Sequence, residues 1–65
     1  MVIQHLLRQA RQHELEGAWV AVAATFAALA SAHPSDHRFL VNQANALWLA
    51  DLPDAARECY ARALR

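Results

Sequence analysis

The stretch GAWVAVAATFAALASA, residues 17–32, decides how this chain folds, because it contains no charged residue and no proline. Its large side chains recur every three or four residues, at Trp19, Val22, Phe26 and Leu29. His33-Pro34 follows directly, and proline disfavours a continuing helix because it lacks the N–H that the helix interior needs. The stretch therefore predicts a helix over about residues 18–32.

Two targeting segments would also have an apolar run of this kind. A membrane-spanning helix needs about 20 apolar residues, and this run is shorter and contains Thr25 and Ser31. A signal peptide would explain the two preceding arginines and the A-x-A pattern of residues 30–32, but two glutamates lie where a basic region is expected. We therefore expect a helix of a folded domain and no membrane partner, and we favour the cytoplasm although the sequence leaves the compartment unknown.

Three further helices are predicted on either side of this stretch, over about residues 2–15, 36–50 and 52–65. Gly17 is expected to end the first helix, because glycine tolerates the positive φ of a helix C-terminus. Ser35 and Asp36 are N-cap candidates for the third helix, and Asp51 for the fourth, with Pro53 in its first turn. Connections of two to four residues make consecutive helices antiparallel.

The composition fits one small domain spanning residues 1–65, with 16 alanines and a modest apolar core. Six arginines balance six acidic residues, and the zero net charge argues against nucleic acid or an anionic membrane as partner. The single cysteine excludes an intrachain disulfide and a cysteine-based zinc site. The absence of lysine beside abundant alanine and arginine is typical of GC-rich bacterial genomes.

The chain repeats itself with a period of 34 residues. At this offset six positions are identical: Leu6 and Leu40, Gln9 and Gln43, Ala10 and Ala44, Leu15 and Leu49, Ala21 and Ala55, Ala27 and Ala61. Both helix pairs and both turns superimpose without a gap, which divides the chain into repeats over 3–34 and 37–65.

This 34-residue helix–turn–helix period resembles the tetratricopeptide repeat. The first unit has the family's residue types at Leu6, Ala10, Phe26 and Pro34, and the second at Leu40, Ala44, Leu47, Ala56, Tyr60 and Ala63. Gln9 and Gln43 depart from the pattern, since the family prefers leucine there. The resemblance implies an all-α fold in which two antiparallel helical hairpins, four helices in all, stack as a short right-handed solenoid. The alternative is a four-helix up-and-down bundle whose repetition is accidental.

In this family the first helix of each pair lines a concave groove. Carried over to this chain, the predicted partner-binding residues are Arg8, Arg11, Arg38, Asn42, Asn45 and Trp48. Asparagine amides suit the backbone of an extended peptide, and arginines suit carboxylates. The set resembles part of the carboxylate clamp of family cochaperones, incomplete because Leu7 replaces the expected cation; the alternatives are general peptide binding or a merely solvated polar face. Trp48 is either a groove anchor or a packing residue.

The resemblance also implies a polar capping helix after the last repeat, and the chain ends at Arg65 without one. The fourth helix is therefore expected to expose an apolar edge for self-association, formed by Leu52, Cys59, Tyr60 and Ala63. Either the chain is a fragment of a longer repeat protein, or another chain covers this edge.

The sequence predicts a non-catalytic module that binds a protein or peptide. No catalytic residue, metal site or cofactor is expected, because the four histidines lack a completing ligand set and Cys59 lacks a neighbouring base. The alternative functions are a self-association domain, hence a possible homo-oligomer, or the N-terminal repeat part of a larger enzyme or secretion component.

Overall fold

The computed structural model describes residues 2–65, which form four helices and no strand. The helices are α1 (Val2–Leu15), α2 (Trp19–Ala32), α3 (His37–Leu49) and α4 (Pro53–Ala63). Each predicted helix is present and ends within about two residues of its predicted bounds. The all-α prediction is therefore confirmed.

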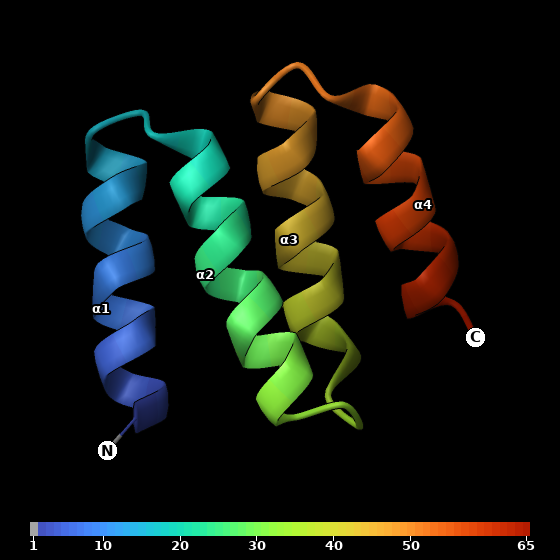
Figure 1. Ribbon diagram of the computed structural model, residues 1–65, viewed down its shortest axis with the longest axis horizontal. Helices are drawn as coiled ribbons and strands as arrows, with labels where there is room; N and C mark the ends of the chain where they lie inside the picture. The colour runs from blue at the N-terminus through green and yellow to red at the C-terminus, as the bar shows by residue number, and fades with distance from the viewer. Residues whose placement is uncertain (1) are drawn as a thin grey trace.

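The four helices lie side by side in chain order, each antiparallel to the one before it (Figure 1). The Cα atoms extend over 28 × 26 × 11 Å, so the row is little more than one helix thick. Within residues 2–65, helices pack only on their sequence neighbours, and α1 does not approach α4. A four-helix bundle brings its first and last helices together. The bundle alternative is therefore wrong, and the protein is two hairpins stacked side by side; the right-handed sense of the stack stays a prediction.

The turns of the two hairpins have the same backbone structure, 34 residues apart. Gly17 and Asp51 both have a left-handed backbone, with φ of 69° and 64°. The next residue in each turn donates its N–H to a carbonyl five residues back, from Ala18 to His13 and from Leu52 to Leu47, both at 2.9 Å. This is the Schellman ending of a helix, which satisfies carbonyls that would otherwise lack a partner.

The helix N-termini follow the sequence prediction at one position and depart from it at another. Asp36 caps α3, since its carboxylate accepts from the Arg38 backbone N–H at 3.2 Å. The N-cap prediction for Asp51 is wrong, because this residue ends α3 and Leu52 precedes α4 without a side-chain cap. Asp tolerates the left-handed region better than most residues, which explains why one residue type fits both positions. Pro53 still begins α4, as expected.

The core lies around α2 and consists largely of small side chains. Its main cluster comprises Ala10, Val22, Ala23, Phe26, Leu29, Phe39 and Ala46. Leu29 is the largest side chain that is fully buried. Trp19 packs partly buried against this cluster. Ala10 and Ala44, equivalent positions of the two repeats, are 1% and 0% exposed, so these small residues lie where neighbouring helices approach closely.

The predicted apolar edge on α4 is wrong for most of its residues. Cys59 and Ala63 are only 5% and 8% exposed, and Tyr60 is half-buried. Because α4 packs on α3 alone, these residues face α3 and form no free edge. Leu52 is 43% exposed and is the one member of the set that stays accessible. The periodic apolar side of α4 is thus used inside the chain.

The membrane-spanning alternative for the apolar run finds no support in α2. Of the helices in residues 2–65, none combines the length and the apolar character that crossing a bilayer requires. The run instead supplies the buried side chains Val22, Ala23, Thr25, Phe26 and Leu29. The one polar member, Thr25, donates its hydroxyl to the Ala21 carbonyl at 2.9 Å.

Ala44→Leu is expected to destabilise the protein by roughly 1–3 kcal/mol, because a larger side chain overpacks a fully buried position between α3 and its neighbours. Urea unfolding followed by circular dichroism measures this change. Ala28→Leu is the matched control, since Ala28 is exposed on α2. Equal unfolding midpoints for the two variants would contradict the close helix packing.

Gly17→Ala is expected to destabilise the protein by about 1 kcal/mol, because an L residue at positive φ is strained. A Cβ on Gly17 would meet no atom within 4 Å, so backbone strain alone sets this cost. Asp51→Gly at the equivalent position is expected to stabilise it by about 0.5 kcal/mol. Chemical denaturation of both variants tests the pair, and a stable Gly17→Ala protein would show that the left-handed turn is unimportant.

Candidate functional site

A groove runs over α2 between α1 and α3, with a volume of about 180 Å³. Its apolar floor is Trp19, Val22 and Phe26 of α2, together with Ala46 of α3. Its polar and rim residues are Glu14, Asn42, Asn45 and Leu49. The structure therefore brings the two predicted asparagines together on one wall, as their spacing of three residues indicates.

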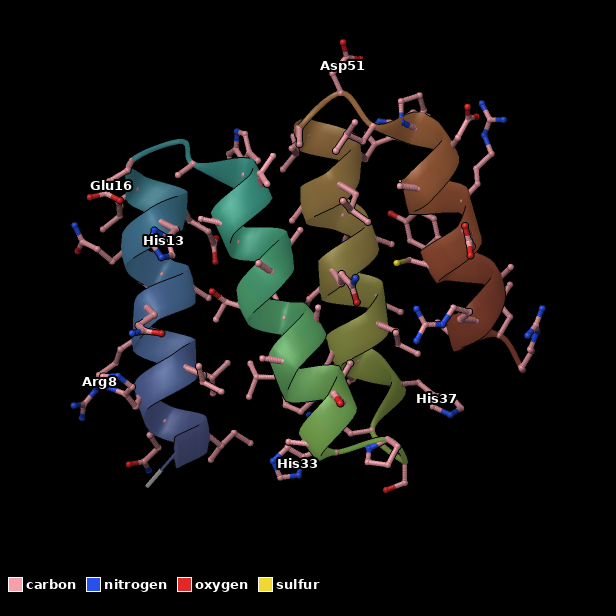
Figure 2. All side chains as sticks on the ribbon, viewed as in Figure 1. Arg8, His13, Glu16, His33, His37 and Asp51 are labelled. Atoms are coloured by element: carbon pink, nitrogen blue, oxygen red, sulfur yellow. The ribbon has the colours of Figure 1, made fainter. Side chains whose placement is uncertain are left out.

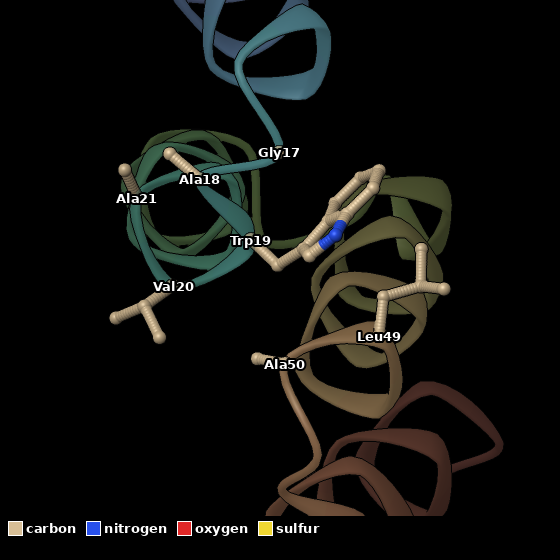
Figure 3. A pocket seen from close by; sticks show the side chains of 7 residues that line it. All are labelled: Gly17, Ala18, Trp19, Val20, Ala21, Leu49 and Ala50. Atoms are coloured by element: carbon tan, nitrogen blue, oxygen red, sulfur yellow. The ribbon is translucent and has the colours of Figure 1, made fainter.

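A second hollow, of about 420 Å³, lies at the end of the molecule where the two hairpin turns meet. It is lined by Gly17, Ala18, Trp19, Val20, Ala21, Leu49 and Ala50. Figure 3 shows the Trp19 ring reaching toward the side of Leu49, while Val20 points away from both. Trp19 and Leu49 line both the hollow and the groove, so the two depressions adjoin at these side chains.

The two asparagines of the groove differ in what they contact. The Tyr60 hydroxyl of α4 donates a hydrogen bond to Oδ1 of Asn45, which fixes the orientation of that amide. The Asn42 side chain makes no hydrogen bond with the described part of the chain and is exposed. Asn42 therefore offers both a donor and an acceptor to a partner, whereas Asn45 offers chiefly its N–H groups.

Arg38 is held by a neighbouring carboxylate instead of facing the groove. Its Nη2 and Nε atoms lie 2.7 and 2.9 Å from the two carboxylate oxygens of Asp36. This two-pronged hydrogen bond to Arg38 lowers the pKa of Asp36 to about 2 and raises the pKa of Arg38. Arg38 lines neither the groove nor the hollow. The structure thus does not bring it together with the asparagines.

The other predicted binding residues are exposed but lie outside the groove lining. Arg8 and Arg11 of α1 form no ion pair with residues 2–65. Figure 2 shows Arg8 in the half of α1 away from the hairpin turn, and Glu16 and Asp51 at the turns. Trp48 is 55% exposed on α3, which removes the possibility that it serves mainly as a packing residue.

Four large apolar residues that line the groove were not singled out as binding residues from the sequence: Trp19, Val22, Phe26 and Leu49. The helical spacing of the first three predicted only a helix over about residues 18–32. These three side chains both pack in the interior and line the groove, because α2 lies beneath the groove and its large side chains separate α1 from α3. The available signal for Leu49 was its identity with Leu15 one repeat earlier, at a position that both leucines expose.

No metal-binding cluster accompanies the groove in the described residues. Within residues 2–65, no three His, Cys, Asp or Glu side chains come together as a metal site would need. His13 lies 3.4 Å from Glu16 through Nδ1 and Oε1. His33 packs its ring on Phe39, and Cys59 is a buried free thiol. These groups have structural contacts and do not converge on the groove.

Comparison of the chain with protein-family models, curated proteins and solved structures found no match. The tetratricopeptide resemblance therefore stays a prediction.

Acidification is expected to remove the stabilising contribution of the Asp36–Arg38 pair. The pKa of Asp36 is lowered from 3.8 to about 2 on folding, so its contribution is complete above the unfolded pKa and is lost as the pH falls through that range. A carbon-13 NMR titration of the Asp36 carboxyl measures this directly. In Arg38→Ala the Asp36 pKa should rise toward 3.8, because the dominant hydrogen bond is gone.

Arg57→Ala serves as the control for this titration, because it removes a different surface ion pair, with Asp54 at 3.4 Å. It should leave the pKa of Asp36 unchanged. An Asp36 carboxyl that titrates near 3.8 in the unmodified protein would contradict the pairing.

Proposed function

We propose that this protein is a non-catalytic interaction module that binds a peptide segment of a partner protein in the groove over α2. The carrying observation is the exposed Asn42 amide, which has no partner in the described chain, on the wall of an apolar groove. An extended peptide has backbone donors and acceptors that an asparagine amide can satisfy together.

The groove combines the two features that recognition of a peptide needs. Trp19, Val22 and Phe26 give an apolar floor for a side chain of the peptide. Asn42 and Asn45 stand three residues apart on α3 and face the same groove. The hydrogen bond from Tyr60 holds Asn45 in place before any ligand arrives, which lowers the entropy lost on binding.

A clamp for acidic peptides is the less supported form of this proposal. Such a clamp needs arginines that are free to pair with the carboxylates of the ligand. Arg38 is already paired with Asp36, and the one charged residue lining the groove is the acidic Glu14. The groove therefore favours a ligand that is neutral or basic where it passes α1.

Asn42→Ala is expected to weaken peptide binding about tenfold, because a lost hydrogen bond to backbone costs about 1 kcal/mol or slightly more. The ligand is first selected from a random peptide library displayed on phage, with the 65-residue chain as bait. The selected synthetic peptide is then titrated by calorimetry. Circular dichroism checks that the variant keeps its helices.

Glu58→Ala is the matched control, since Glu58 is exposed on α4, which does not line the groove. It should bind like the unmodified chain. Selection of no specific peptide, or equal affinities for the Asn42 and Glu58 variants, would rule against binding in the groove.

A further inference from the structure

The chain exposes more large apolar side chains than it buries. Among residues 3–65, the large buried ones are Val22, Phe26, Leu29 and Phe39. The exposed ones are Leu7, Leu15, Val20, Val41, Trp48, Leu49, Leu52 and Leu64. A single row of helices has two broad faces and little interior, so a chain of this size gains stability when a second protein surface covers one face.

Several of these exposed side chains share the face that contains the groove. On α1, Leu7, Arg11 and Glu14 follow one another at helical spacing, and Glu14 lines the groove. On α3, Val41, Asn45 and Trp48 occupy the equivalent positions 34 residues later, and Asn45 lines the groove. We call this the groove face, and its members are Leu7, Arg11, Glu14, Val41, Asn45, Trp48 and Leu49.

Charge is distributed unevenly from one end of the helices to the other. The end with the hairpin turns carries four of the six acidic residues: Glu14, Glu16, Asp51 and Asp54. The opposite half carries four of the six arginines: Arg8, Arg38, Arg62 and Arg65. Figure 2 shows this separation for Glu16 and Asp51 at one end and Arg8 toward the other. The zero net charge therefore conceals an uneven distribution of charge along the helices, acidic toward the turns and basic toward the other end.

We propose that two copies of this chain associate through their groove faces, related by a two-fold axis that makes α1 antiparallel to α1 and α3 antiparallel to α3. The axis passes between Arg11 and Glu14, which are about one helical turn apart on α1. Arg11 of each copy then faces Glu14 of the other copy. Neither side chain has an ion pair within residues 2–65, so both are available. An interface of this kind uses the same patch twice, as two-fold symmetry requires.

The 34-residue repeat makes the same arrangement fit on α3. Asn45 and Trp48 are the equivalents of Arg11 and Glu14 one repeat later, so the proposed axis crosses α3 near this pair. The exposed Trp48 and Leu49 then lie near the centre of the interface, where aromatic and apolar anchors contribute most. Because Arg11 and Glu14 lie near the turn end of α1, the two copies overlap over the part of the 28 × 26 Å face nearest the turns, so the interface is smaller than the ~800 Å² per partner of a standard one.

This inference rests on the groove face being a surface that binds protein, as proposed above, but it names a different occupant. Light scattering behind a sizing column, over a concentration series, should give a mass of two chains at the upper end. Leu49→Glu should give one chain at the same concentrations, because it places a charge in the interface, with at least a tenfold rise in the dissociation constant.

Leu64→Glu is the matched control, since Leu64 is 88% exposed beyond the end of α4 and outside the groove face. It should stay at two chains. A one-chain mass for the unmodified protein up to about 1 mM, or loss of association in both variants alike, would overturn the proposal. Circular dichroism confirms that each variant is folded.

A charge exchange tests the antiparallel pairing itself. Arg11→Glu alone and Glu14→Arg alone should each be monomeric where the unmodified chain is dimeric, because like charges then meet across the axis. A mixture of the two variants should regain a mass of two chains, since each repulsive pair becomes attractive. Failure of the mixture to associate would overturn the two-fold arrangement. A monomeric chain that binds the selected peptide would overturn the dimer and support peptide binding. A dimer that binds no peptide would support the dimer and overturn peptide binding.

Discussion

The close contact of α2 with α3 is the interaction on which the rest of the structure depends. It joins the two hairpins, because α1 and α4 each pack on a single neighbour. Small side chains such as Ala23 and Ala46 let the helix backbones approach, and Phe26 and Phe39 fill the space that remains. Without this contact the chain would be two separate hairpins, each too short to bury a core. The groove also depends on it, since its floor and its asparagine wall come from these two helices.

Much of the fold follows from local features of the sequence. Apolar spacing and Pro34 define α2, Asp36 caps α3, and short connections make neighbouring helices antiparallel. The 34-residue period of the sequence corresponds to a repeat in the structure, since Gly17 and Asp51 have the same left-handed backbone in the two turns. The assignment of Asp51 as a helix cap failed because aspartate suits helix beginnings and left-handed turns alike. Only the hydrogen bonds of the neighbouring helix decide between these roles.

The site was less predictable than the fold, because it depends on contacts between helices and not on the spacing of residues along one helix. Helical spacing shows which side of α4 is apolar, but not that α3 already covers Cys59 and Ala63. Spacing placed Asn42 and Asn45 together correctly, since residues three apart share a face in any helix. Helical spacing gave no sign that Arg38 would be held by Asp36. That contact depends on the turn before α3, where Asp36 lies. Surface function here is set by which side chains remain without a partner.

The row of helices has a consequence for how the protein folds. Every helix packs on the helix before or after it in the chain, so the contacts that hold the structure join segments close in sequence. Proteins with such local contacts fold fast, within microseconds to milliseconds, because only short loops must close. Either hairpin can form first and provide a template for the other, since the two have the same turn. In the same row, the outer helices α1 and α4 each pack on one neighbour only. Each can therefore unfold locally by losing a single helix–helix interface.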